Sequence, residues 1–578
     1  MILFLLLLFP LFGYAADRSP SVESGSQESI TAPSGPLVIS DRWPQATDLV
    51  SWTRDVMRLE HLENASETAQ ARAFFEWLRL FSRMAVGGMI QPFEGDYGHE
   101  GYVTDAHKTL FVYGWGYCDT TSRIAEAAWK EYKNDSRAAE RVCVQHADGG
   151  YHTMYRLFLN GRYAAFDPRY GYYLIDHDAP DARVLDWAEV GVDANILKNR
   201  DFRYRSRPFF EIFGLEWDRA LLLQPTYFKN ERAWRAAGSP KESVFGNSKY
   251  RMGTRFHDMS FRLPRGTTIE RFWDNSAREF YVPAAKVAQR EWPFLPSGRF
   301  YRVTEASLNG NWPKYDPNYE RAKPYLVSVP SGEGYSPEMA GKRTIGQAWG
   351  RIRYTPDFRT NAFTDALAPG STLVRANAAP YLRPRDIRGG GEAIFDFYSP
   401  YVLVDGTLRA ELLGQGAKLE IRTLEDKLTS QAEPDLWSQW QTIASAAGGT
   451  TVQLGRPRYN GKDVSIDGKY RFQIRVSVSA DARRTAAAGL KNLSLEMYFE
   501  NGIMSIPQIF PGANTIDFRL KDADRLQGPV RITYTYETAS GERSQTNVLR
   551  ASDFHGDAAQ YSFEAPTLIR CKSLAIAY

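Results

Sequence analysis

Apolar and polar residues follow two different periods, one near the N-terminus and one beyond residue 245. In residues 68–84, Phe74, Trp77, Leu78 and Phe81 recur at the spacing of one helix face, which is typical of a helix that packs into a core. After residue 245, long helical periodicity is nearly absent, and short β-prone runs alternate with Gly, Pro, Asn and Asp. This second pattern predicts β-sandwich modules. The expected fold class is therefore α+β, with a mixed N-terminal domain followed by β-sandwich modules.

Shifts in composition indicate where these parts begin and end. Residues 17–36 are rich in Ser, Pro, Gly and Glu, which predicts a flexible linker between the signal peptide and the first domain. We expect six segments: a signal peptide (1–15), the linker (16–45), a mixed α/β domain (46–245), a β-rich middle region (246–390), a β-sandwich (391–500) and a C-terminal β module (501–578).

The N-terminus carries an apolar run at residues 2–12, followed by Gly13-Tyr14-Ala15. The run is too short to span a membrane, and the small-x-small ending matches a signal-peptidase site. We therefore expect a secreted or periplasmic protein whose mature chain has no transmembrane anchor.

Composition narrows the possible partners. A net charge of +3 gives no reason to expect nucleic acid. The three cysteines are too few for a disulfide framework; Cys143 and Cys571 could pair, although the β-prone run around Cys143 favours a structural thiol. Phosphate loops, Cys-x-x-Cys pairs and His-Glu-x-x-His are missing from the sequence, so no cofactor and no metal are expected.

Cys118 stands at a predicted helix start. It is followed by Asp-Thr-Thr-Ser at residues 119–122, residue types that commonly cap helices, and then by Ile124, Ala127 and Ala128 on one helical face. At or just before a helix N-terminus, the helix dipole and unpaired amides favour a thiolate and could hold an oxyanion. Cys118 is therefore a candidate nucleophile, against the plainer interpretation of a small buried residue.

A hairpin downstream supplies candidate partners. Asn160-Gly161 is a strong two-residue turn signal, and counting outward from it pairs Met154 with Asp167 and His152 with Arg169. His152 and Asp167 then become diagonal neighbours on one face of the sheet, about 7–8 Å apart at the backbone. In that position the carboxylate can orient the imidazole.

The order of these motifs resembles the transglutaminase-like superfamily, whose papain-like core carries a Cys-His-Asp triad. The residues that carry the resemblance are Gly116-Tyr117-Cys118 before a helix, His152 at the start of a strand, and Asp167-Pro168 at the end of the next. It covers roughly residues 60–240. It implies Cys118 as nucleophile, His152 as base and Asp167 as the residue that orients the base.

The sequence departs from that superfamily in two respects. Thr153-Met154-Tyr155 follows His152 where many members have a Trp soon after the His, and the acidic calcium cluster of the animal cross-linking enzymes is not apparent. Protein cross-linking is therefore not implied. The superfamily also contains peptidases, amidases, glycanases and inactive relatives.

Aromatic and basic residues flank the predicted triad. They are expected either to contact the substrate or to pack in the core, and they are Trp115, Tyr117, Arg169, Tyr170 and Tyr172. His146 is a rival base, but it has no predicted carboxylate partner.

Two functions remain open. The first is a secreted cysteine hydrolase or acyltransferase that acts on amide bonds through the triad. The second is a carbohydrate-active or polysaccharide-binding protein, with lyase chemistry included, in which His152 and a tyrosine use the same cleft. The partner is accordingly an extracellular or periplasmic protein or polysaccharide.

Overall fold

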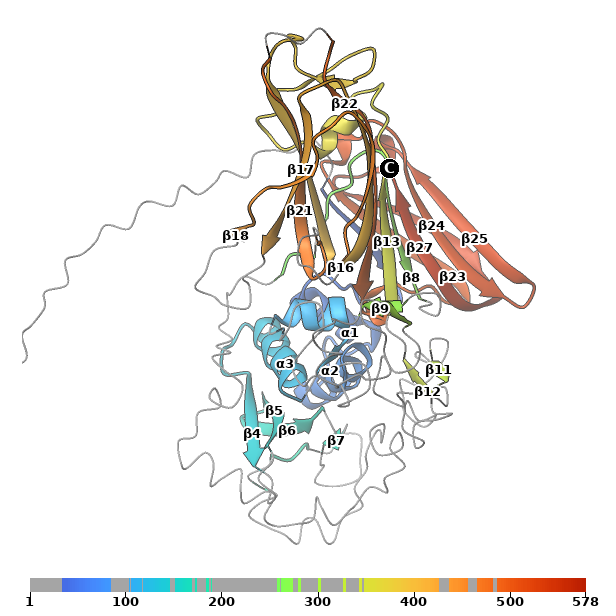
Figure 1. Ribbon diagram of the computed structural model, residues 1–578. Helices are drawn as coiled ribbons and strands as arrows, with labels where there is room; N and C mark the ends of the chain where they lie inside the picture. The colour runs from blue at the N-terminus through green and yellow to red at the C-terminus, as the bar shows by residue number, and fades with distance from the viewer. Residues whose placement is uncertain are drawn as a thin grey trace, which may run out of the picture.

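The computed structural model is built mainly of β-strands, with three α-helices packed beside them in the described part of the chain (Figure 1). The residues described are 34–84, 103, 105–116, 118–145, 151–168, 172–173, 183–186, 189, 257–259, 261–273, 279–281, 300–302, 326–328, 343–345, 348–425, 436–455, 465–481 and 486–578. The predicted signal peptide lies outside these residues.

The α-helices are α1 (Leu49–Leu59), α2 (Glu67–Phe81) and α3 (Cys118–Lys133). Asp48 caps α1 by accepting a hydrogen bond from the amide of Ser51, and Ser66 caps α2 in the same way. The apolar stripe predicted at Phe74, Trp77, Leu78 and Phe81 is buried on α2, which confirms the helical interpretation. Phe74 packs on Trp52 of α1 and Trp129 of α3, so aromatic rings join the three helices.

Two short strands and a π-helix lie in the described residues between α2 and α3. Strand β2 (Arg83–Met84) pairs in parallel with β3 (Trp115–Gly116), and a π-helix, η1 (Lys108–Tyr113), precedes β3. Gly114 joins η1 to β3 with φ 69°, a left-handed conformation that glycine adopts without steric cost. α3 then begins at Cys118.

A four-stranded antiparallel sheet lies next to the helices (Figure 1). It contains β4 (Ala139–Gln145), β5 (Tyr151–Leu159), β6 (Arg162–Asp167) and β7 (Tyr172–Tyr173), paired in chain order. Asn160 and Gly161 connect β5 to β6 with φ of 50° and 83°, the two positive values of a type I′ turn. The predicted hairpin is therefore confirmed.

The β part of the molecule is dominated by one 14-stranded sheet. Its main path runs β18-β17-β21-β16-β22-β13-β8-β27-β24-β25, with β14, β15, β19 and β20 paired to its side. The long strand β16 (Gly391–Leu413) pairs with β21 through its first half and with β22 through its second, with a register shift between Tyr398 and Leu403. β16 therefore belongs to both halves of the sheet.

The other strands of this sheet are β8 (Thr267–Phe272), β13 (Ala348–Tyr354), β14 (Val374–Arg375), β15 (Leu382–Arg383), β17 (Ala417–Glu425), β18 (Leu436–Trp437), β19 (Gln441–Ala444), β20 (Gly448–Gln453), β21 (Lys469–Val478), β22 (Gly489–Asn501), β24 (Val530–Thr538), β25 (Gly541–Leu549) and β27 (Leu568–Ala577). Two small hairpins pair β9 (Glu279–Tyr281) with β10 (Phe300–Arg302), and β11 (Leu326–Ser328) with β12 (Arg343–Ile345). Short 3-10 helices are η5 (Ala362–Ala366), η6 (Ile503–Ser505), η7 (Ala523–Arg525) and η8 (Ala551–Asp553).

Pairing in this sheet crosses the boundaries expected from composition. β13 joins β22 to β8, and β8 joins β13 to β27, so strands of the middle region, the β-sandwich and the C-terminal module form one sheet. The backbone N–H and C=O groups on the edge strand of one segment form hydrogen bonds with a strand of the next segment. Composition alone does not predict such pairing.

The N-terminal strand β1 (Ser34–Ser40) lies beside the C-terminal module. It pairs with β23 (Gly512–Lys521), which pairs with β26 (Ala558–Ala565), in a separate three-stranded sheet. Residues 34–40 therefore differ from the flexible linker expected over 16–45. Val38 of β1 is buried, and long-range pairing with β23 outweighs the linker-like composition.

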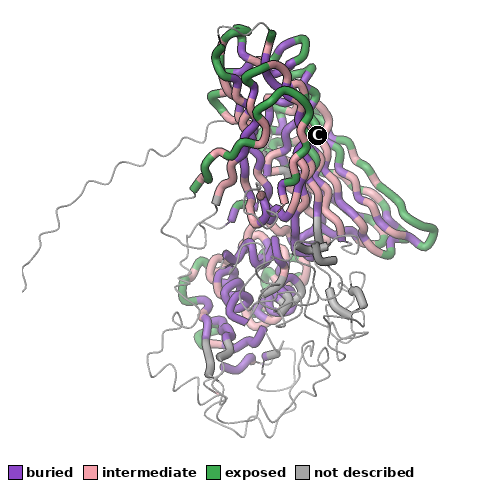
Figure 2. The backbone as a smooth tube through the Cα atoms, viewed as in Figure 1, coloured by how far each residue is buried: buried purple, intermediate pink, exposed green. Residues whose placement is uncertain are grey.

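The helices and the β part share a buried interface (Figure 2). The indole of Trp43 donates to the carbonyl oxygen of Met504 at 2.7 Å and packs on Trp77 of α2 and on Phe510. The amide of Gly502 donates to the carbonyl oxygen of Phe111 in η1 at 3.2 Å. The segment that leads into Cys118 is therefore held by the end of β22.

Candidate functional site

Cys118 is the first residue of α3, and its side chain is a buried thiol, 7% exposed. The position agrees with the predicted helix start. One turn later, Oγ of Ser122 donates to the carbonyl oxygen of Thr153 in β5 at 3.3 Å. The N-terminal turn of α3 therefore lies against the beginning of β5, where the residue before Thr153 is His152.

Asp119 has a different role from the cap expected. It lies inside α3, with its carboxylate buried, and accepts from Arg123 at 2.7 Å and from Arg141 of β4 at 2.9 Å. A carboxylate that accepts hydrogen bonds from two guanidinium groups acts in charge pairing and not as a helix cap. Asp119 therefore fixes α3 to the sheet.

Arg141 links two acidic residues of α3. Its Nε donates to Glu126 at 2.7 Å, and Lys130 also contacts Glu126, at 2.6 Å. Burial alone would raise the pKa of Glu126, but the charges of Arg141 and Lys130 outweigh it and hold the pKa below its ordinary value. Burial likewise opposes the charge of Arg141, yet Glu126 and Asp119 raise its pKa. This network fixes the position of α3 against β4. No motif in the sequence predicted it.

The hairpin has the register expected from its turn. Tyr155 pairs with Phe166, and Leu159 pairs with Arg162 next to the turn, so the same count places Met154 opposite Asp167. Asp167 is fully buried and is paired on its other side with Tyr172 of β7. Asp167 and Tyr172, two of the predicted site residues, are therefore neighbours in the sheet.

The two faces of this sheet have different surroundings. Tyr155 stacks on Phe166 at 5.5 Å between ring centroids, and Phe75 of α2 packs on Phe166. These rings mark the face toward the helices, and alternation along β6 places Asp167 on the other face. The side chain of Asp167 therefore lies on the face of the sheet opposite to Phe75 of α2.

Several predicted site residues are placed only in part or not at all. The backbones of His152, Trp115 and Tyr172 lie in β5, β3 and β7, and their side chains are outside the description. Tyr117, Arg169, Tyr170 and His146 lie outside the described residues. The roles predicted for these side chains stay predictions.

The cysteines outside the predicted triad lie in separate strands. Cys571 is a buried thiol in β27 whose Sγ donates to the carbonyl oxygen of Ile509 at 3.6 Å, so it is not in a disulfide with Cys143. The backbone of Cys143 lies in β4, as its β-prone sequence predicts.

Comparisons with known proteins identify no family. No family model matches the chain, and no curated protein matches it. Among solved structures, tailspike protein 4 of bacteriophage CBA120 is 10% identical over 26% of this chain and 19% of its own, with a TM-score of 0.14. Xylanase10C of Cellvibrio japonicus is 12% identical over 24% and 28%, with a TM-score of 0.13. A Paenibacillus xanthan lyase is 12% identical over 37% and 24%, with a TM-score of 0.13.

The chain thus spans less than a third of the length of these three proteins. TM-scores this low do not define a shared fold, and the function has to be argued from the residues themselves. Within the described residues, no helix is long and apolar enough to cross a membrane.

Proposed function

We propose that the protein is an exported transglutaminase-like cysteine hydrolase or acyltransferase that acts on amide bonds. The observation that carries the proposal is the hydrogen bond from Ser122 to the carbonyl oxygen of Thr153. It holds the helix turn that begins with Cys118 against the start of β5, one residue after His152. The register of the hairpin, with Met154 opposite Asp167, supports the third member of the triad.

The chemistry follows from these positions. The Cys118 thiolate attacks the carbonyl carbon of an amide, and amides at the start of α3 stabilise the oxyanion. His152 delivers a proton to the departing amine, which leaves an acyl thioester on Cys118. Water or a second amine then attacks the thioester and gives its proton to His152, so that hydrolysis and transfer differ only in the second nucleophile. Asp167 holds the imidazole in the required tautomer.

Alkylation of the thiols tests the proposal. Iodoacetamide should alkylate Cys118 faster than Cys571, and the rate at Cys118 should fall in His152→Ala and Asp167→Asn. Cys571→Ser is the matched control, because Cys571 is also a buried thiol but lies far along the chain in β27. Equal, slow alkylation of both thiols would reject a catalytic Cys118.

Activity separates this function from the carbohydrate alternative. Wild type and Cys118→Ala are compared on peptide and glycan libraries in parallel. The proposal expects amide cleavage or transfer that Cys118→Ala abolishes, while the thermal unfolding midpoint is kept. Glycan cleavage or binding that is the same in Cys118→Ala would favour the carbohydrate-active protein instead.

A further inference from the structure

An alternating stack of arginine and tryptophan side chains covers the outer face of the sheet at β21, β17 and β18. Its order is Arg471, Trp437, Arg422, Trp440 and Arg475, and we call it the Arg-Trp ladder. The Arg422 guanidinium lies 4.6 Å from the ring of Trp437 and 4.5 Å from that of Trp440. The guanidinium of Arg471 lies 5.5 Å from the ring of Trp437, and that of Arg475 lies 4.4 Å from the ring of Trp440. Such stacking is a cation–π arrangement.

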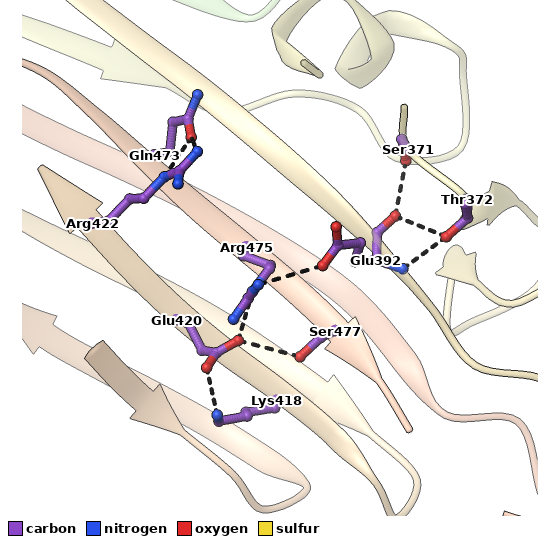
Figure 3. Close-up of polar contacts among 9 residues, drawn as sticks. All are labelled: Ser371, Thr372, Glu392, Lys418, Glu420, Arg422, Gln473, Arg475 and Ser477. Carbon is purple, nitrogen blue, oxygen red and sulfur yellow. Dashed lines mark hydrogen bonds and ion pairs between the residues drawn. The ribbon is translucent and has the colours of Figure 1, made fainter. Parts of the chain in front are cut away.

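The two outer arginines are neutralised by carboxylates. Arg471 donates to Asp396 through two nitrogens, and Arg475 donates to Glu420 at 2.7 Å and lies 3.5 Å from Glu392. Lys418 also contacts Glu420 (Figure 3). These carboxylates are therefore occupied by the ends of the ladder and by a neighbouring lysine.

The central arginine has a neutral partner instead. Nε and Nη2 of Arg422 both donate to Oε1 of Gln473, at 2.8 and 2.6 Å (Figure 3). Within the described residues Arg422 forms no ion pair. A guanidinium has five N–H donors, and no described residue accepts a hydrogen bond from Nη1 of Arg422.

Among the described residues in contact with the ladder, cations outnumber carboxylates. The cations are Arg262, Lys418, Arg422, Arg471 and Arg475, and the carboxylates that contact them are Glu392, Asp396 and Glu420. Burial lowers the pKa of Arg422, and the charges of Arg475 and Arg471 lower it further, while the charges of Asp396 and Glu392 partly oppose them. An anion placed against Arg422 would relieve that repulsion. Because two indoles fix the plane of the guanidinium, binding costs little conformational entropy.

We propose that Arg422, held between Trp437 and Trp440, binds the carboxylate groups of an acidic polysaccharide on this face of the β-sheet. The outer edge of the guanidinium matches a carboxylate in a bidentate manner. Exposed side chains beside the ladder are polar, at Ser438, Gln439, Gln441 and Thr442. They suit sugar hydroxyls, and Leu436 is the one large apolar side chain that is exposed among the described residues of this stretch. The proposal does not depend on Cys118.

Binding of the full chain to polygalacturonate, neutral dextran and poly-L-glutamate tests the proposal by calorimetry. The wild type should bind polygalacturonate and not dextran, with affinity that falls as salt is added. Arg422→Gln should weaken binding about tenfold or more, because a hydrogen-bonded charge pair is lost. Arg422→Lys keeps the charge but loses the planar guanidinium edge with its two parallel donors. Its affinity should therefore lie between those of the wild type and Arg422→Gln. Arg543→Gln, at an exposed arginine of β25, should bind as wild type.

Three outcomes would overturn the proposal. They are equal affinity for polygalacturonate and dextran, tighter binding of poly-L-glutamate, and unchanged affinity in Arg422→Gln. Thermal unfolding of each variant accompanies the binding data. A ladder with a purely structural role would lower the unfolding midpoint in both Arg422 variants without separating their affinities. If Arg422→Gln does not fold, Arg422→Lys with wild-type affinity and wild-type salt dependence would reject the site.

Discussion

Replacing Gly502 by alanine adds one methyl group where the β part of the molecule touches the segment before Cys118. A Cβ at residue 502 would lie 3.2 Å from the amide nitrogen and Cα of Gly114, and 3.3 Å from the carbonyl oxygen of Phe111. The backbone of Gly502 has φ −60° and ψ 128°, which alanine adopts without strain. The effect of the substitution is therefore steric.

The contact can relax only if the two segments move apart. Forcing a methyl group into a packed contact typically costs about 1–3 kcal/mol, and the movement also lengthens the hydrogen bond from Gly502 to Phe111. We expect Gly502→Ala to lower the free energy of unfolding by about 1–3 kcal/mol. Because Gly114 leads through β3 to Cys118, the rate of alkylation of Cys118 should change as well.

Urea unfolding followed by tryptophan fluorescence measures the first effect, and timed alkylation with iodoacetamide measures the second. Gly449→Ala in β20 is the control, because nothing lies within 4 Å of a Cβ built there, and its stability should change by less than about 0.5 kcal/mol. Equal urea midpoints for the two variants would refute the steric argument. Lower stability of Gly502→Ala with unchanged alkylation would show that the contact supports the fold without setting the position of Cys118.

Further predictions concern the charges on α3 and the N-terminal strand. Arg141→Leu should destabilise the protein by about 3–5 kcal/mol, because Asp119 and Glu126 lose their buried partner. The exposed Arg137, paired only with Asp135 at 3.4 Å, should change the urea midpoint little when replaced by Ala. The pKa of Glu126 is held below its ordinary value of 4.5, so its stabilisation is present above that pH and lost as pH falls through the folded pKa; Glu126→Gln should flatten the acid limb of stability measured against pH. A variant lacking residues 1–41 removes β1 and should lower the unfolding midpoint, whereas one lacking residues 1–33 keeps β1 and should not; equal midpoints would contradict a structural role for β1.

Local signals in the sequence predicted the elements they specify directly. The stripe from Phe74 to Phe81 placed α2 and its buried face, and Asn160-Gly161 set both the turn and the register of β5 with β6. Each of these signals acts within about one or two turns of chain, so no distant contact could override it. The start of α3 at Cys118 belongs to the same group.

Long-range pairing accounts for what the sequence did not predict. The composition of residues 16–45 resembles a linker, yet β1 is a strand because β23 offers a partner at residues 512–521. The sequence predicted that Asp119 caps the helix, because capping is a local tendency. Its carboxylate instead accepts a hydrogen bond from the buried Arg141 of β4. The face of the sheet that Asp167 occupies also depends on where the helices dock.

The charge partners of Arg422 in the Arg-Trp ladder likewise could not be predicted from the local sequence. Arg471 and Arg475, four residues apart on β21, are visible in the sequence, but their charge balance depends on which strands lie on either side. β21 lies between β16 and β17, so Gln473 stands between Asp396 and Arg422. Because Gln473 is an amide, Arg422 has no carboxylate partner among the described residues, whereas a glutamate there would neutralise the ladder internally. Gln473→Glu should therefore reduce polygalacturonate binding as strongly as Arg422→Gln, and retained binding would mean that the ladder's charge is not what the ligand recognises. The variant also removes the hydrogen bond from Gln473 to Asp396 at 3.3 Å, so its unfolding midpoint is measured beside its affinity.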